Sequence, residues 1–297
     1  MNADRFDLVT VAGRARGRLD PVSAGEIAAF VRAAWCADGG FRSRGGASDL
    51  YYTVFGMSAL RALDAELSTE QVRPYLATFG DGEDLDFVHL VCLARCRAMQ
   101  GRSGLWRSVA RPALKRLETW RSADGGYHHR LQHAPQGTAY GCLLAALAYG
   151  ESGAIMPAPR TIARCLDGLR RADGSWANDQ DAIDGTTTAT AAAVVVLTVL
   201  DALAEERTSA SWLRDRLAPS GGFVASPATP AADLLSTATA LHALRVLGSP
   251  LESLRDACSA FVEGLWDESG GFRGHALDPI ADCEYTFYAL LALGCLA

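Results

Sequence analysis

The sequence predicts an all-α protein in which six helical hairpins close into an (α/α)6 toroid. A tight glycine turn followed by an aromatic residue recurs at residues 38–41, 124–127, 173–176, 220–223 and 269–272. The last four copies are spaced 49, 47 and 49 residues apart, and a degenerate copy at residues 80–84 divides the longer first interval. A constant period of this length is typical of repeat architectures, in which each unit buries its apolar face against its neighbours.

Each repeat carries one helical segment before the turn and one after it, and the two differ in polarity. The segments before the turn have a charged face, at residues 24–35, 68–78, 105–121, 159–171, 211–217 and 251–266. The segments after the turn are apolar nearly all round, at residues 50–63, 85–99, 138–149, 186–203, 234–247 and 284–295. A helix with a polar face belongs outside and one without it belongs inside. We therefore expect one toroid domain at residues 24–297, preceded by an N-terminal extension at residues 1–23.

Composition and charge exclude several classes of protein. The net charge of -6 argues against a nucleic-acid binder, because such proteins usually present a basic face. No apolar run reaches 18 residues, so no transmembrane segment is expected. The first 21 residues are charged and lack the apolar core of a signal peptide. The eight cysteines contain no CxxC pair and lie mostly in apolar runs, which indicates reduced thiols and a cytoplasmic protein.

The repeated turns resemble those of a known superfamily. Six-fold alternation of helices with DGG(F/W) turns is similar to protein prenyltransferase β subunits, squalene–hopene cyclases and class II terpene cyclases. The resemblance covers residues 24–297. It implies an isoprenoid substrate bound in a central cavity. It also implies a helical partner subunit, as the transferases need, or else either a homo-oligomer or a lumen that is open on one side.

Two segments resemble the zinc-binding segments of prenyltransferase β subunits. The last repeat is similar to D-x-C-Y-S-F-W, where Asp282 matches the zinc-binding Asp and Glu284 replaces the Cys. The first repeat is similar to D-x-Y-H-T, where Tyr52 replaces the His that is the third ligand. Because two of three ligands are replaced, zinc and thiol prenylation are not expected.

A third segment resembles class II terpene cyclases. Residues 173–176 read DGSW, and Asp184 aligns with the middle, proton-donating Asp of D-x-D-D-T-A when Thr186 is placed on the motif Thr. Gly185 and Ala182 replace the flanking acids. The resemblance implies that Asp184 is a general acid.

The predicted architecture places the N-termini of all six inner helices on one rim, next to the turns. Free N–H groups and helix dipoles make such a rim attractive to an anion such as a diphosphate. Arg42, Arg44, Arg130 and Arg273 follow the turns and add positive charge. Below the rim we expect an apolar lumen with an aromatic lining that stabilises carbocations without trapping them. The residues expected to line it are Tyr51, Tyr52, Phe55, Phe87, Tyr140, Tyr285, Phe287 and Tyr288.

Four acidic residues are candidates for catalysis. A carboxylic acid in an apolar wall has a raised pKa and can protonate an alkene. Asp184 is the first candidate, the adjacent Asp282 and Glu284 are the second, and ring closure brings Asp49 beside them. Three carboxylates together could instead hold Mg²⁺ with a diphosphate. The simpler interpretation, that an Asp before an apolar helix is an N-cap and an aromatic residue is core, stays open for each position.

The sequence therefore supports three functional hypotheses. The first is a terpenoid cyclase-like enzyme that acts on a prenyl diphosphate or prenylated substrate by acid-initiated carbocation chemistry. The second is a transferase that moves a prenyl group to a small molecule or a peptide. The third is a toroid without catalytic activity that binds a hydrophobic ligand or a partner chain.

Overall fold

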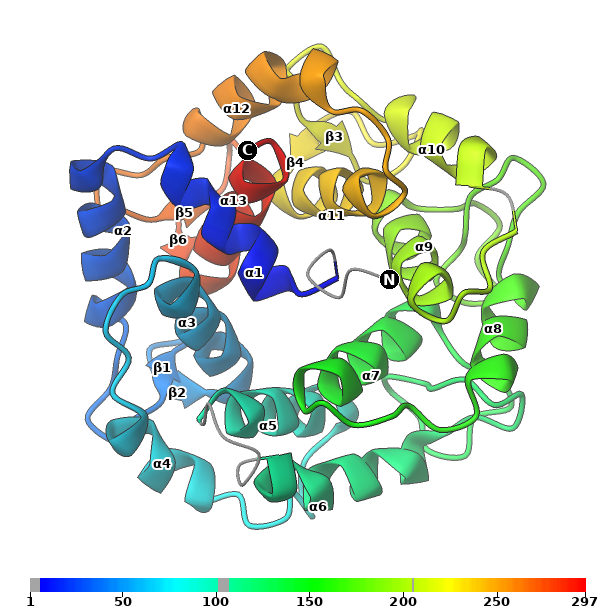
Figure 1. Ribbon diagram of the computed structural model, residues 1–297, viewed down its shortest axis with the longest axis horizontal. Helices are drawn as coiled ribbons and strands as arrows, with labels where there is room; N and C mark the ends of the chain where they lie inside the picture. The colour runs from blue at the N-terminus through cyan, green and yellow to red at the C-terminus, as the bar shows by residue number, and fades with distance from the viewer. Residues whose placement is uncertain (1–5, 101–106, 205) are drawn as a thin grey trace.

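The computed structural model describes residues 6–100, 107–204 and 206–297, and it shows a closed ring of helices in two layers (Figure 1). The inner layer consists of α3 (Leu50–Ala62), α5 (Phe87–Met99), α7 (Ala139–Glu151), α9 (Thr187–Val199), α11 (Leu234–Val246) and α13 (Cys283–Cys295). The outer layer consists of α2 (Pro21–Ala33), α4 (Thr69–Ala77), α6 (Arg107–Leu117), α8 (Pro159–Gly168), α10 (Glu206–Arg214) and α12 (Arg255–Glu263). The predicted α/α toroid is confirmed.

The inner helices are buried on most of their surface, whereas the outer helices bury one face. In α11, ten of the thirteen residues are buried. In α12 only three of nine are buried, in keeping with its single apolar stripe. Three short 3-10 segments complete the helical structure of the described residues: η2 (Arg14–Gly17) follows α1 (Leu8–Gly13), η3 (Glu118–Trp120) follows α6, and η4 (Glu252–Leu254) precedes α12.

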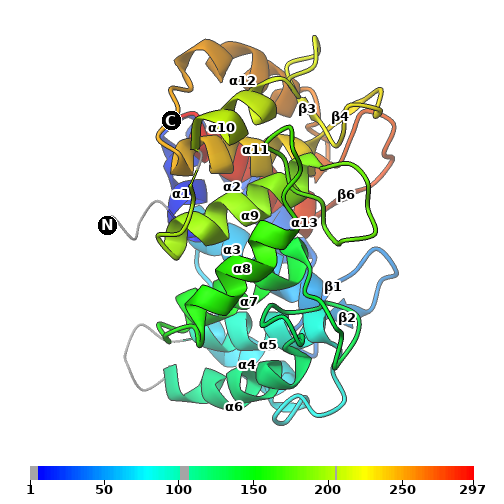
Figure 2. The same ribbon diagram turned by 90° about the vertical axis from the view of Figure 1, so that its right-hand side faces the viewer.

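Three of the glycine turns form two-stranded antiparallel hairpins that lead into an inner helix. These are β1 (Phe41–Arg42) with β2 (Ser48–Asp49), β3 (Phe223–Val224) with β4 (Ala232–Asp233), and β5 (Phe272–Arg273) with β6 (Ala281–Asp282). In the register, Phe41 faces Asp49, Phe223 faces Asp233 and Phe272 faces Asp282. The hairpins lie on one side of the ring, and the N-terminal helix lies on the other (Figure 2).

The turn glycine is required both by backbone conformation and by a close contact. Gly221 and Gly270 have φ values of 89° and 92°, which L side chains rarely adopt. A Cβ atom at Gly221 would stand 2.2 Å from the carbonyl oxygen of Ala257 on α12, the outer helix of the next repeat. At Gly270 it would stand 2.8 Å from the carbonyl oxygen of Glu26 on α2. The last turn therefore packs on the first outer helix, and this contact closes the ring.

A buried threonine fixes the aromatic residue of four turns. The backbone N–H of Phe223 donates to Oγ1 of Thr237 at 2.9 Å, and both residues are fully buried. The same bond joins Phe41 to Thr53, Trp176 to Thr190 and Phe272 to Thr286, at 2.9 to 3.1 Å. Each threonine is the fourth residue of its inner helix. These threonines satisfy an N–H group that would otherwise be unpaired in the core.

The N-terminal segment folds onto the ring. The helix α1 (Leu8–Gly13) lies inside the ring against α13 and α3, and η2 continues it (Figure 1). At Gly294 of α13 a Cβ atom would stand 2.0 Å from the carbonyl oxygen of Val11, so the two backbones touch. The first outer helix begins at Pro21, with Asp20 as its N-cap, slightly before the predicted start at residue 24. Within the described residues, none of the helices has the length and apolarity that a membrane crossing needs.

Candidate active site

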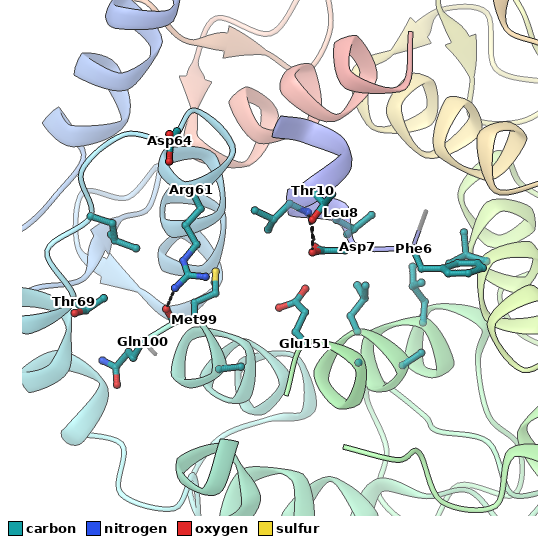
Figure 3. A pocket seen from close by; sticks show the side chains of 18 of the residues that line it. Phe6, Asp7, Leu8, Thr10, Arg61, Asp64, Thr69, Met99, Gln100 and Glu151 are labelled. Atoms are coloured by element: carbon teal, nitrogen blue, oxygen red, sulfur yellow. Dashed lines mark hydrogen bonds between the residues drawn. The ribbon is translucent and has the colours of Figure 1, made fainter. Parts of the chain in front are cut away.

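A cavity of about 1170 Å³ occupies the lumen and opens at the C-terminal ends of the inner helices. Ligand sites in proteins commonly have volumes of about 300–1,000 Å³, so this cavity has room for a long prenyl chain. Its apolar wall includes Leu143, Leu147, Val195 and Val199 of α7 and α9. Residues 6–10 cross the mouth, with Phe6 on the side of α7 and α9 (Figure 3).

The rim at the N-termini of the inner helices is closed by capping side chains, which corrects the expectation of an electropositive, anion-binding rim. Each inner helix has a side-chain acceptor at its N-cap: Asp49, Asp86, Thr138, Thr186, Asp233 and Asp282. Four of the six are carboxylates, which occupy the N–H groups and offset the positive end of the helix dipole. The N-cap interpretation is therefore confirmed for Asp49 and Asp282.

Three of the four arginines expected to bind an anion at this rim bind the protein itself, and the fourth, Arg130, is exposed. The guanidinium of Arg44 donates to Asp278 at 2.8 Å and to Asp282 at 2.6 Å. Arg42 donates to the carbonyl oxygen of Ala33, and Arg273 donates to that of Trp266. Arg44 thus joins the first repeat to the last, across the seam where the ring closes.

Aromatic side chains from opposite sides of the ring gather at the floor of the lumen. The ring of Phe55 lies 5.0 Å from that of Tyr51 and 5.4 Å from that of Tyr288 on α13. Tyr140 on α7 is close enough to Glu284 that the carboxylate raises the pKa of this tyrosine, although burial is the larger cause. Tyr140 also lies one helical turn from Leu143, which lines the cavity. The floor cluster (Tyr51, Phe55, Tyr140, Glu284 and Tyr288) therefore lies on the N-terminal side of the cavity, about one helical turn from its lining at Leu143.

Phe87 and Tyr285 lie away from the floor cluster, whereas Phe287 and Tyr52 pack against its edge, with rings 5.8 Å from those of Phe55 and Tyr51. Phe87 is fully buried between Trp120 and Tyr127, with ring distances of 5.7 and 6.2 Å, in the core between inner and outer layers. Phe287 is also fully buried. Tyr285 follows the hairpin at the N-terminal rim, where the guanidinium of Arg44 stands 5.4 Å from its ring centre.

Glu284 has the surroundings that a general acid needs. It is half-buried on the first turn of α13, and burial raises its pKa to about 7. The hydroxyl of Tyr51 donates to Oε1 of Glu284 at 2.6 Å, which leaves Oε2 to carry an acidic proton. Near neutral pH a substantial fraction of this carboxyl is therefore protonated and still reactive.

Asp282 and Asp49 are held as acceptors. Oδ2 of Asp282 accepts from Arg44 and Oδ1 accepts from the backbone N–H of Tyr285 at 2.9 Å, so both oxygens are occupied even though burial raises the pKa of this carboxyl. Asp49 accepts from two N–H groups of α3 and pairs with His89 at 3.3 Å. The bond between His89 and Asp49 lowers the pKa of Asp49 and raises the pKa of His89 to about 9. Neither Asp is a proton donor in this arrangement.

Asp184 lies outside the lumen. The helix α9 begins at Thr187 and its N-cap is Thr186, so Asp184 does not open the helix as predicted. Asp184 is exposed in the preceding loop. It therefore lacks the apolar surroundings on which its proposed acidity depends.

The residues at this rim do not fit a metal ion. Asp282 is bound by Arg44, Glu284 by Tyr51 and Asp49 by His89, so the three carboxylates do not share a site. Among the described residues, no three His, Cys, Asp or Glu side chains are placed to hold a metal ion together. Neither the zinc site of the transferases nor a Mg²⁺ site made of these carboxylates is supported by the side chains present.

Sequence reasoning missed a second charged group of the lumen. Arg95, on α5, donates from Nε to both oxygens of Glu151 at 3.0 Å, and Nη2 lies 2.8 Å from Oε1. Glu151 lines the cavity, and both side chains are largely buried, at 5% and 15% exposure. Two arginines inside a mostly apolar helix, Arg95 and Arg97, were the available signal, because such a charge is rarely buried unless it is paired.

Comparison with known proteins gives the family. The model of the prenyltransferase alpha-alpha toroid domain matches residues 17–79, 92–209 and 191–297. No curated protein matches the chain.

Two solved structures have a similar fold. One is a variant of the type II terpene cyclase MstE from Scytonema, in complex with geranylgeranyl dihydroxybenzoate. It has a TM-score of 0.64 at 14% identity, covering 98% of this chain and 97% of that one. A protein from Actinoplanes has a TM-score of 0.61 at 18% identity, covering 93% and 98%. Sequence identities this low show only that the fold is shared. The family rests instead on the family model, which matches most of the sequence. The chain therefore belongs to the prenyltransferase alpha-alpha toroid family.

Proposed function

We propose that this protein cyclises an isoprenoid and that Glu284 starts the reaction by protonating a terminal alkene. The observation that carries the proposal is the half-buried carboxyl of Glu284, which accepts from the hydroxyl of Tyr51 and whose pKa burial raises to about 7. A carboxylic acid that stays protonated near neutral pH can donate a proton to a weakly basic alkene without a metal.

The proton and electron balance of the reaction is simple. The proton on Oε2 of Glu284 passes to the terminal alkene carbon, and the π electrons of that alkene form the new C–H bond. The resulting carbocation is attacked by the next alkene of the chain, which forms a ring. Loss of a proton from the last carbocation gives an alkene and restores the acid by way of solvent, so the product is an isomer of the substrate.

The floor cluster supplies the environment that the cations need. The rings of Tyr51, Phe55 and Tyr288 pack together beside the acid, which accepts from the hydroxyl of Tyr51. Aromatic faces attract positive charge without forming a bond to it. The cavity lies on the C-terminal side of this cluster along α7 and has room for the rest of the chain in a folded conformation. The similar fold of a type II terpene cyclase that binds a geranylgeranyl compound supports this choice of substrate class.

Prenyl transfer finds less support. A transferase must bind a diphosphate and activate an acceptor, usually with metal ions. The N-terminal rim is capped by carboxylates, and Arg44 is bound by Asp278 and Asp282. No arrangement of the described residues favours this second function.

Product analysis tests the proposal. The purified protein is incubated with prenyl alcohols and prenyl diphosphates of ten to twenty carbons, and extracts are searched for cyclic isomers of each substrate. We expect a cyclic product from at least one substrate, its loss in Glu284→Gln, and its retention in Asp184→Asn. Absence of any cyclic isomer, or full activity of Glu284→Gln, would refute the assignment.

A further inference from the structure

The mouth of the cavity carries more acidic than basic side chains. Among the described residues that line the cavity, Asp7, Asp64, Glu66 and Glu151 are acidic, and Arg61 is basic. Figure 3 shows the carboxylate of Glu151 pointing across the mouth toward Asp7. The mouth also lies at the C-terminal ends of the inner helices, where the helix dipole is negative.

The arginines near the mouth are engaged by the protein. Arg61 donates to the carbonyl oxygen of Met99 at the end of α5, and Figure 3 shows this bond. Arg95 is bound by Glu151, and Arg16 lies 3.3 Å from Asp64. A diphosphate entering here would have to compete for these arginines, and it would face Asp7 and Glu66, which form no ion pair among the described residues. The repulsion between like charges increases as the distance between them decreases.

One buried polar group of the wall lacks a partner. Gln100 is 8% exposed and lines the cavity, and its Nε2 has no hydrogen-bond partner among the described residues. A side-chain amide nitrogen is a donor of two hydrogen bonds. A buried donor without a partner is costly, so an acceptor oxygen on the bound molecule would stabilise the complex.

We propose that the cavity takes an isoprenoid whose head group is uncharged and carries an acceptor oxygen, such as an alcohol, a phenol or a carbonyl, and that it discriminates against prenyl diphosphates. This inference rests on the proposed function for the isoprenoid chain. The head group then stands at the acidic mouth near Gln100, and the hydrocarbon chain points into the lumen. In this orientation the terminal alkene is the end of the chain directed toward Glu284.

Binding measurements test the head-group preference without turnover. Isothermal titration of the full chain compares geranylgeraniol with geranylgeranyl diphosphate, which share one hydrocarbon chain. At low ionic strength we expect the alcohol to bind at least about tenfold more tightly, and we expect the difference to shrink as salt screens the carboxylates. Diphosphate binding that equals or exceeds alcohol binding in wild-type protein would overturn the inference.

Variants assign the preference to residues. In the double variant Asp7→Asn with Glu66→Gln, we expect diphosphate to bind more tightly while alcohol binding is unchanged; Asn at residue 7 still caps α1. Glu70→Gln on α4, which does not line the cavity, is the matched control. Gln100→Leu should weaken alcohol binding by roughly two- to tenfold, the value of one hydrogen bond. Unchanged diphosphate binding in the double variant would overturn the role of these acids. Failure of cyclisation with an intact head-group preference would instead refute only the proposed reaction.

Discussion

Replacing Glu284 by Gln should change the pH dependence of stability in a way that measures the environment of this carboxyl. In the unfolded chain a glutamate ionises near pH 4.5, whereas burial keeps Glu284 protonated up to about pH 7 in the folded protein. Between these values the folded state holds one more proton than the unfolded state. The free energy of unfolding therefore falls as the pH rises through this window and levels off above it.

The size of the effect follows from the raised pKa. At about 1.36 kcal/mol for each pH unit, the interval from 4.5 to about 7 corresponds to about 3 kcal/mol. The glutamine is neutral at every pH, and its amide oxygen can still accept from Tyr51. The variant should therefore gain about 3 kcal/mol relative to wild-type protein between pH 4.5 and pH 8.

Urea denaturation of both proteins at a series of pH values is the assay. Other titrating groups affect both proteins alike and cancel in the difference. Glu263→Gln, at an exposed position of α12, is the matched control and should show no such trend. A difference between Glu284→Gln and wild type that varies by less than about 0.5 kcal/mol over this range would refute the reasoning, since ordinary surface substitutions have effects of that size.

Three further predictions concern the ring itself. Arg44→Met leaves two buried carboxylates without their cation and should lower the free energy of unfolding by about 3 kcal/mol, measured by urea denaturation; a loss within error of zero would show that the seam does not depend on it. Thr237→Val leaves the N–H of Phe223 unpaired and should cost about 1–3 kcal/mol in the same measurement. Thr239→Val is its control, because that hydroxyl bonds only to carbonyls of its own helix. Equal losses in both variants would contradict a stabilising role for the bond between Thr237 and Phe223. Gly294→Ala should push α1 away from the mouth and speed hydrogen exchange at residues 8–13; unchanged exchange there would mean that α1 tolerates the methyl group.

The repeat architecture was predictable because its signals are short segments of sequence that recur in each repeat. The turn glycine needs positive φ, the residue after it is buried, and the two helices of each hairpin differ in polarity. Any chain with six such units has few ways to bury its inner helices. The fourth-position threonines, such as Thr237, were equally regular and went unnoticed, because their partner is a backbone N–H twelve to fourteen residues earlier.

The site was harder to predict because it depends on contacts between repeats. Asp184 and Thr186 are both good N-cap residues, and only the structure shows that Thr186 is the cap. The sequence placed the N-termini of the inner helices on one rim correctly, but it could not show that carboxylates cap them and that the cavity opens at the opposite end. Glu284 was a candidate from its alignment, but its hydrogen bond to Tyr51 spans the seam between the first and last repeats.

The most direct test of the account is the origin of the proton that starts the reaction. The enzyme is supplied in heavy water with whichever isoprenoid it cyclises, and the product is examined for deuterium at the carbon that was the terminal alkene. Wild-type protein should place one deuterium there, because the exchangeable acid of Glu284 delivers it, and Glu284→Gln should give no cyclic product. A cyclic product without deuterium at that carbon, or one formed equally well by Glu284→Gln, would contradict the central claim.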